Sequence, residues 1–327
     1  MQTAAALTAW QPVARRALLT TLGATTAFAA DRSPTRPLEV RLGSQHQLGA
    51  LRRAELDYQT SDGHRMPASV YFAESTTRAP AILLLHGHHS AGRRSMAVID
   101  RKLGYGESAA AIDLARAGFV VFAPDIRTFG ETGSRTDHEF VARALLLDGR
   151  VAVGEFLRDL ARAVDAMAEL SVVDPDRIGV AGLSLGGHLS LYLAAVEPRI
   201  KAAVVAGYLA SNRRTHLERK HCICQYIPGL LRLMDIDDVG LIAAPKPMLY
   251  VSGRKDREFP IDQAQSSFRH IRRGYRALGA EDSAELVVHG GRHEWKSPPA
   301  IQFLKKHLAP SGASAPLHRY RAPDDNR

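Results

Sequence analysis

Cysteine is nearly absent from the sequence, since only 2 of the 327 residues are Cys. A scaffold held together by several disulfides is therefore excluded, and the fold must rely on a hydrophobic core. Glycine and proline, with 26 and 17 residues, stand at ordinary levels, which excludes collagen-like and low-complexity chains. Hydrophobic residues make up 45% of the chain, enough for a large globular domain.

Charge of one sign is only in modest excess: 43 Lys and Arg face 34 Asp and Glu, and the formal net charge is +9. A nucleic-acid-binding protein gathers basic residues on one face, often with aromatic residues between them. The basic residues of this chain are mostly dispersed along it. No nucleic-acid partner is therefore expected.

The first 30 residues lack acidic residues and carry two basic ones, Arg15 and Arg16. The apolar and small run that follows, 17–30, is shorter than the roughly 20 residues that span a bilayer. Because it ends in Ala27-Phe28-Ala29, with small residues where a signal peptidase reads, residues 1–29 are predicted to be a cleaved export signal. The protein is then expected to be periplasmic or secreted, without stable membrane insertion; the arginine pair loosely fits the twin-arginine route.

Between a predicted linker at 30–50 and a predicted flexible tail at 309–327, residues 51–308 alternate short apolar runs with helical patterns. The alternation predicts an α/β domain whose central sheet is mostly parallel, with helices on both faces. Turn residues at 61–63 predict a hairpin before this sheet, and the stretch at about 211–240 is predicted to be an insertion near the active site. The predicted buried strands are 81–85, 119–123, 178–181, 202–206, 247–251 and 285–288.

A candidate nucleophile lies in Gly182-Leu183-Ser184-Leu185-Gly186, directly after the predicted strand at 178–181 and before a helical pattern at 188–193. G-x-S-x-G at a strand-to-helix junction is typical of a sharp turn that holds a serine hydroxyl above the edge of the sheet. The start of the following helix offers backbone N–H groups to developing negative charge. Ser184 is therefore predicted to be a catalytic nucleophile, with the N–H of Leu185 as one oxyanion donor.

The second oxyanion donor is expected in the loop after an earlier strand, where His86-Gly87-His88-His89 follows 81–85. Gly87 allows the backbone to curl, so the N–H of His88 is predicted to face Ser184. The same run lacks the aspartate of the metal-binding pattern H-x-H-x-D-H, so no metal and no cofactor are expected. The predicted pocket-lining residues are His89, His188 and Tyr226.

The base and its orienting acid are expected after later strands, in that chain order for this type of site. Asp256 follows the strand at 247–251 and is the preferred acid over Glu258, Asp237 and Asp238. His293 lies beyond two glycines after the last strand, in a loop that can reach the nucleophile, and is preferred as the base. Ser184, His293 and Asp256 are thus the predicted triad.

These motifs resemble the α/β-hydrolase superfamily in the order elbow, acid and base, over about residues 51–308. Within it, Ala123 to Arg127, Gly182 to Gly187 and the ending HGGRHEW resemble the branch of dienelactone hydrolases, acetyl xylan esterases and prolyl-oligopeptidase-like peptidases. The resemblance implies an α/β-hydrolase fold and hydrolysis of a small carboxylic ester, acetyl or another short chain. Dienelactone hydrolases proper have a cysteine where Ser184 stands. Peptidase activity, lactone or thioester hydrolysis, and a catalytically silent binding module remain the alternatives.

Two further pairs stand outside the predicted triad. Cys222 and Cys224 are separated by one residue, a spacing at which a disulfide is strained, and a structural zinc needs four ligands. They are therefore interpreted as two packed thiols. Asp125 and Arg127, which follow the strand at 119–123, are predicted to pair with each other near the site. The natural substrate and the oligomeric state are left open by the sequence.

Overall fold

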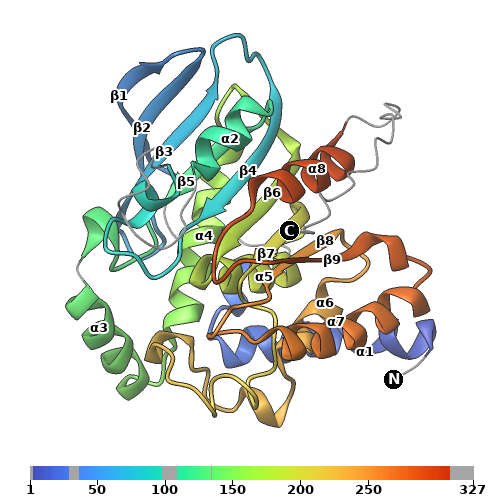
Figure 1. Ribbon diagram of the computed structural model, residues 1–327. Helices are drawn as coiled ribbons and strands as arrows, with labels where there is room; N and C mark the ends of the chain where they lie inside the picture. Colours follow the sequence, from blue (N-terminus) through green and yellow to red (C-terminus); the bar gives the residue numbers. More distant parts are fainter. Residues whose placement is uncertain (1–2, 29–36, 98–108, 134, 310–327) are drawn as a thin grey trace.

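The computed structural model describes residues 3–28, 37–97, 109–133 and 135–309, without the side chains of 135–137. Nine strands form one sheet in the order β1-β2-β3-β5-β4-β6-β7-β8-β9 (Figure 1). The first strands pair antiparallel and those from β5 to β9 pair parallel, as the sequence predicts. The strands are β1 Val40–Leu48, β2 Leu51–Gln59, β3 Arg65–Ala73, β4 Ala79–Leu85, β5 Val120–Pro124, β6 Val173–Leu183, β7 Ile200–Ala206, β8 Met248–Gly253 and β9 Ala284–His289.

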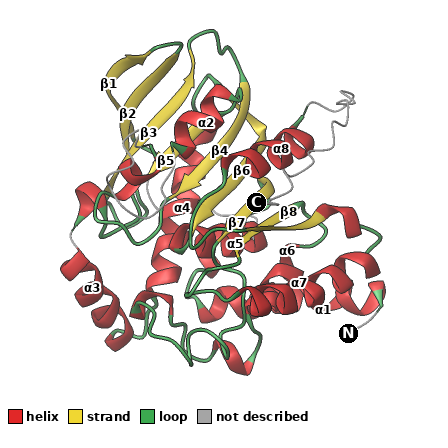
Figure 2. Ribbon diagram, in the orientation of Figure 1, coloured by secondary structure: helices red, strands yellow, loops and turns green. Residues whose placement is uncertain are grey.

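Helices cover both faces of this sheet, as expected for parallel strands buried on two sides (Figure 2). Alternate residues of β4 point to opposite faces: Leu83 and Leu85 join the larger core cluster, whereas Ile82 and Leu84 join the smaller one. Helices α2 and α8 belong to the smaller cluster and α1, α4, α5, α6 and α7 to the larger one. The helices are α1 Ala4–Thr21, α2 Ala110–Arg116, α3 Arg135–Leu147, α4 Ala152–Ala168, α5 Leu185–Val196, α6 Ile236–Ala243, α7 Ile261–Ala277 and α8 Ser297–Leu308.

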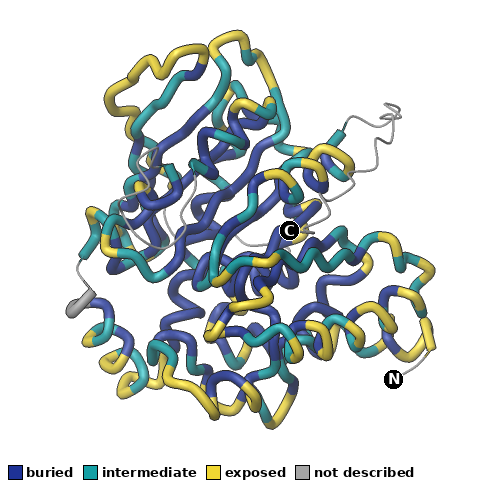
Figure 3. The backbone as a smooth tube through the Cα atoms, in the orientation of Figure 1, coloured by how far each residue is buried: buried dark blue, intermediate teal, exposed yellow. Residues whose placement is uncertain are grey.

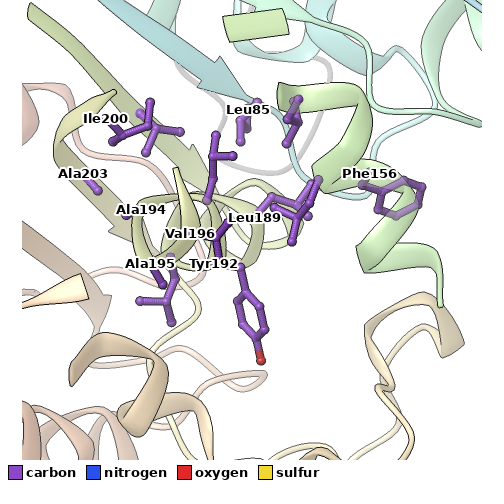
Figure 4. Packing of buried hydrophobic residues seen from close by; sticks show 14 of the residues in the cluster. Leu85, Phe156, Leu189, Tyr192, Ala194, Ala195, Val196, Ile200 and Ala203 are labelled. Carbon is purple, nitrogen blue, oxygen red and sulfur yellow. The ribbon is translucent and has the colours of Figure 1, made fainter. Parts of the chain in front are cut away.

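Helix α5 is the most deeply buried of the described helices, because every residue from Leu185 to Val196 is buried. Figure 4 shows Leu189 and Tyr192 of α5 among apolar neighbours that include Leu85 from β4 and Phe156 from α4. A helix that is apolar all round must be enclosed, and here sheet and helices enclose it. The residue before α5, Ser184, is thereby held on a rigid support.

The prediction of a linker at 30–50 is wrong for its second half, because residues 40–48 form the edge strand β1. Val40 pairs with Tyr58 and Leu48 with Leu51, and a register shift interrupts the ladder between Leu42 and Gln45. Strand β1 is exposed along almost its whole length (Figure 3), and it has too few apolar residues in alternation for a period-two signal. Hydrophobic periodicity therefore does not reveal this strand.

Most of the predicted export signal is a helix that packs against the body of the protein. Leu7 and Leu18 of α1 are 1% and 0% exposed, and the helix contacts α5, α6 and α7. Gln11 donates to the carbonyls of Leu241 and Ala244 at 2.8 and 2.6 Å, and Arg15 donates to Ala195 O and Ile242 O at 2.8 and 3.0 Å. The predicted tail, 309–327, lies outside the described residues except for Ala309.

The predicted insertion leaves the sheet after β7 and returns through α6. Its first part, 211–235, consists of turns and the short 3₁₀ helices Ile223–Gln225 and Leu230–Arg232. Asp235 caps α6 in a capping box with Asp238, each side chain accepting a backbone N–H of the other's residue. The insertion thus runs over the carboxyl ends of the parallel strands, where sites in such sheets form.

Candidate active site

Ser184 occupies a strained turn between β6 and α5, with φ 59° and ψ −117°. The turn is as tight as glycine permits: a Cβ on Gly186 would lie 2.0 Å from Leu85 O, and one on Gly182 would lie 2.4 Å from the Gly186 carbonyl carbon. The Ser184 N–H donates to Ala206 O at 2.9 Å and anchors the turn to β7. This is the nucleophile-elbow geometry that the G-x-S-x-G motif predicts.

His293 and Asp256, which follow β9 and β8, form a close pair. His293 Nδ1 lies 2.8 Å from Asp256 Oδ2, and Asp256 Oδ1 accepts the N–H groups of Glu258 and Phe259 at 2.9 and 3.0 Å. Burial alone raises the pKa of Asp256, but the hydrogen bond and charge of His293 and the two N–H groups outweigh it, and the pKa is lowered. Burial lowers the pKa of His293, but the hydrogen bond and charge of Asp256 prevail and the pKa is raised.

The rival acids occupy other positions. Glu258 lies on the opposite side of the His293 ring, with Oε2 at 3.8 Å from Nε2, and its side chain is half exposed. Asp237 and Asp238 belong to α6, where Asp238 pairs with His270 at 3.1 Å. Only Asp256, among these four carboxylates, contacts Nδ1 of His293.

His293 and Ser184 line the same cavity, and the ring nitrogen of His293 that is not bound to Asp256 is Nε2. It is buried and has no hydrogen-bond partner among the described residues. Gly207, with φ 57°, lies directly under the ring: a Cβ there would come within 2.8 Å of His293 Cε1. A serine, an anchored imidazole and its carboxylate are thereby gathered at one end of the sheet, as the sequence predicts.

The loop after β4 runs against the nucleophile. A Cβ on Gly87 would lie 3.3 Å from Ser184 Cβ. His86 Nε2 accepts the Ile126 N–H at 2.9 Å, so Nδ1 carries the proton and donates to Gly87 O at 2.7 Å. Burial lowers the pKa of His86 to about 4, which keeps this ring neutral. Because N–H and C=O of a trans peptide point in opposite directions, the His88 N–H points away from the His86 ring.

A buried ion pair supports the same loop. Arg93, 4% exposed, contacts Asp125 Oδ2 at 2.6 Å, and its N–H donates to Asp125 Oδ1 at 2.8 Å. The predicted pair of Asp125 with Arg127 is therefore wrong, since Arg127 instead binds Asp159 and Asp62. The reason is that Asp125 points towards the β4 loop, whereas Arg127 lies on the far side of the turn beside α4.

The cavity above Ser184 has a volume of about 270 Å³. One side holds Ser184, His293, Gly87 and Leu183, at the carboxyl ends of the strands. The opposite side, which we call the outer wall, consists of Phe129, His138 and Glu139 together with Lys220, His221, Cys222 and Gln225. It combines the segment around α3 with the insertion.

The predicted pocket residues divide between these places. His88 lines the cavity, whereas His89 turns back locally and accepts the Ala91 N–H at 3.0 Å. His188 lies behind the cavity, fully buried and stacked on Tyr208 with ring centroids 4.4 Å apart, because the first turn of α5 points it into the core. Tyr226 does not line the cavity either; its hydroxyl donates to His216 O at 2.8 Å within the insertion. The predictions for His89, His188 and Tyr226 as lining residues are thus wrong.

Sequence reasoning missed most of the outer wall. His138 and Glu139 lie on α3, an amphipathic stretch without any motif, and nothing in their spacing relates them to Cys222 or Ser184. His221 and Cys222 stood out as residue types, but only the path of the insertion brings them to the cavity. No signal in the single sequence predicts that the residues of the outer wall lie together.

The model of the dienelactone hydrolase family matches residues 84–227, which include the β4 loop, the elbow and the insertion through Ile227. YtaP of Bacillus subtilis, a hydrolase by inference, is 27% identical over 261 residues, which cover 76% of this chain and 85% of the relative. Among solved structures, a Bacteroides fragilis protein assigned by inference as an acetyl xylan esterase superposes with a TM-score of 0.71 at 18% identity, covering 86% of this chain and 75% of that one. A glucuronoyl esterase from Solibacter usitatus superposes with a TM-score of 0.61 at 17% identity, covering 89% and 91%.

Fold and site together define a serine hydrolase of the α/β-hydrolase fold. More particularly, residues 84–227, which carry the elbow, resemble the dienelactone hydrolase family. No helix among the described residues has the length and apolar character needed to cross a bilayer.

Proposed function

We propose that the protein cleaves a short-chain carboxylic ester through an acyl-enzyme formed on Ser184. The observation that carries the proposal is the position of His293. Its Nδ1 is anchored to Asp256 at 2.8 Å, its Nε2 has no hydrogen-bond partner among the described residues, and His293 lines the same cavity as Ser184. An imidazole held in this way is oriented for proton transfer to and from a hydroxyl.

In the first half of the reaction, Ser184 Oγ attacks the ester carbonyl carbon while His293 Nε2 takes the hydroxyl proton. Asp256 stabilises the imidazolium that forms, which its lowered pKa favours because the carboxylate stays ionised. The tetrahedral intermediate collapses, the carbon–oxygen bond to the alcohol breaks, and the alcohol leaves with the proton from His293. Water then repeats the sequence on the acyl-enzyme and releases the carboxylic acid.

The negative oxygen of each intermediate needs two donors, and we assign them to the backbone N–H groups of Leu185 and His88. Leu185 begins α5, so its N–H belongs to the first turn of the helix, which has no intrahelical acceptor. The His88 peptide is held by the contact between His86 and Gly87 O. Two preorganised N–H groups supply the electrostatic stabilisation on which acyl transfer depends.

The size of the cavity favours a small acyl group. About 270 Å³ lies at or below the lower end of ordinary ligand sites, which is about 300 Å³. The named neighbours are described as an acetyl xylan esterase, by inference, and a glucuronoyl esterase. An acetyl ester, whose alcohol part extends into solvent past the outer wall, is therefore the substrate class we propose.

The decisive test compares the intact protein with Ser184→Ala on the p-nitrophenyl esters of acetate, butyrate and octanoate. We expect acetate to be the best substrate and Ser184→Ala to lose at least about 10⁴-fold in kcat, because the residual rate has no nucleophile. Ser283→Ala, in a 3₁₀ turn before β9, is the matched control and should keep its rate. Equal rates for the intact protein and Ser184→Ala would overturn the proposal.

A fluorophosphonate probe separates the alternatives. Labelling of Ser184, located by peptide mass spectrometry, requires an activated serine and would exclude a silent binding module. Parallel assays with acetylated xylan, a lactone, a thioester and a peptide amide then rank the carbonyl substrates. Faster turnover of the amide or the lactone would replace the ester proposal while keeping Ser184 as the nucleophile.

For the location of the protein, the packing of α1 supports a different proposal from cleavage after Ala29. Leu18, 0% exposed, and the hydrogen bonds of Gln11 and Arg15 would all be lost with the helix. We propose that α1 stays in the folded enzyme. Intact-mass measurement on protein from cell fractions tests this. If the protein in an exported fraction begins near residue 30, the segment is a cleaved export signal and the proposal that α1 stays is overturned.

A further inference from the structure

Four side chains with metal-binding atoms, two of them in the outer wall, meet beside the cavity, and the proposed ester hydrolysis uses none of these side chains. They are His88 from the loop after β4, His138 from α3, and Cys222 and Cys224 from the insertion. One donor atom of each lies within 4.8 Å of the donor atoms of all the others. Two pairs are closer still: His88 Nε2 is 3.1 Å from Cys224 Sγ, and His138 Nε2 is 3.3 Å from Cys222 Sγ.

The two closest separations, 3.1 and 3.3 Å, lie near the edge length of a small tetrahedron around a metal ion. Zinc bonds of about 2.0–2.1 Å to nitrogen and about 2.3 Å to sulfur give donor-to-donor edges of roughly 3.3–3.8 Å. Two imidazoles and two thiols are also the donor set that selects zinc over magnesium or calcium, which prefer oxygen. We propose that His88, His138, Cys222 and Cys224 bind one zinc ion in a closed, four-coordinate site.

The proton on His138 is already placed for this role. Thr128 Oγ1 donates its only proton to the carbonyl of Arg127, so it must accept from His138 Nδ1, 2.6 Å away. Nε2, 3.3 Å from Cys222 Sγ, is then the ring nitrogen left to bind a metal. In metal-bound histidines the N–H group of the other ring nitrogen typically donates a hydrogen bond in this way, which fixes the orientation of the ring.

The backbone at Thr128 adds to this observation. Its φ is 72°, a value that β-branched residues rarely adopt, so the turn is held in a strained conformation that carries the hydroxyl to His138. Phe129 lies against both histidines, with ring centroids 4.2 Å from His138 and 5.6 Å from His88. The four donors therefore sit in an ordered, partly apolar surrounding, with His138 and Cys224 buried.

The described residues contain one other group that could hold a metal, Asp237, Asp238 and His270. Its members have a structural use: Asp238 Oδ2 accepts the Asp235 N–H at 3.0 Å in the capping box, and Asp238 Oδ1 pairs with His270 at 3.1 Å. The group offers one nitrogen, no sulfur and no buried residue. It serves as the comparison site for the experiment.

A zinc ion at the outer wall would join three segments that are far apart in sequence. His138 and the two cysteines would tie α3 to the insertion, and His88 would tie both to the loop that carries the proposed oxyanion donor. Because four protein ligands leave no open position for substrate, the ion stabilises this side of the cavity rather than taking part in the reaction. The inference concerns metal binding and holds whether or not Ser184 proves to be the nucleophile.

The test measures zinc in the full chain purified with a reductant and without chelator. We expect about one zinc per chain, loss of most of it in Cys222→Ser and in His138→Gln, and full retention in the control His270→Gln. Replacement of zinc by cobalt should give the intense thiolate-to-cobalt absorption and the visible bands of tetrahedral cobalt, a readout that requires no variant to fold. Zinc should also raise the thermal midpoint of the stripped protein and slow the reaction of its thiols with Ellman's reagent.

Three results would overturn the proposal. One is stripped protein that binds neither zinc nor cobalt under reducing conditions. Another is zinc that is lost in His270→Gln but kept in Cys222→Ser. The last is a cobalt spectrum without thiolate bands, which would place the metal elsewhere. Ester hydrolysis assayed on the same samples distinguishes this inference from the proposed function. If the protein binds no zinc but Ser184 is still acylated, the zinc proposal is overturned and the proposed function is kept.

Discussion

The two sides of the cavity are built in opposite ways. On the side of the strand ends, Ser184, Asp256 and His293 follow three parallel strands directly, and backbone contacts fix them: the Ser184 N–H on Ala206 and two N–H groups on Asp256. On the outer wall, residues from α3 and from a stretch of turns meet through side chains, such as His138 with Cys222. The proposed chemistry lies at the strand ends, whereas connecting segments shape the cavity, which is how one fold serves many substrates.

The largest effect on the rigid side is expected from Asp256→Asn. The asparagine amide favours the wrong tautomer of His293 and cannot stabilise its positive charge, so kcat should fall by about 10³- to 10⁴-fold with little change in KM. Asp282→Asn, an exposed residue in a turn, is the matched control. Steady-state kinetics on p-nitrophenyl acetate measure both. A loss below tenfold would shift the role of the acid to Glu258.

The next test concerns the tightness of the elbow itself. In most helices Gly→Ala is stabilising, but a Cβ on Gly186 would lie 2.0 Å from Leu85 O, so Gly186→Ala should lower the free energy of unfolding by more than about 2 kcal/mol. Gly290→Ala, after β9, meets nothing within 4 Å and should be nearly neutral. Urea denaturation compares the two. Equal urea midpoints for the two variants would mean that the backbone at the elbow shifts to accommodate the added methyl group.

What the sequence predicts follows the same division. The elbow, Asp256 and His293 were identifiable because each stands a few residues after an apolar run, and parallel strands end at a common edge. Strand β1 was missed because its residues are exposed and do not alternate. The meeting of His138 with Cys222 was missed because it depends on two irregular connections, whose paths follow from tertiary packing and not from local preference.

The pH dependence of kcat/KM tests the side of the cavity that holds His293. Below the pKa of this residue, kcat/KM should change by about tenfold per pH unit. Neutral His293 is the proposed base, and its pKa lies above the ordinary 6.5, so kcat/KM should rise with pH through that raised pKa and then level off. In Asp256→Asn burial, which lowers the pKa, remains, while the hydrogen bond to a charged carboxylate and the charge of Asp256 are lost and only the charge of Glu258 still raises the pKa. The rising limb should therefore move to lower pH. A limb that stays in place would show that another group titrates.

The smallest effect is expected from Tyr226→Phe, within the insertion. Its hydroxyl donates to His216 O at 2.8 Å, so the variant loses one hydrogen bond, worth about 1 kcal/mol in the free energy of unfolding. Because Tyr226 touches neither Ser184, Asp256 nor His293, kcat on the acetate ester should stay within about threefold, while the ratio of acetate to octanoate hydrolysis changes as the wall loosens. Thermal unfolding and the two ester rates measure this. If acetate turnover fell as far as in Asp256→Asn, the insertion would have to position a reacting group, and the division between a catalytic side and a side that only shapes the cavity would not hold.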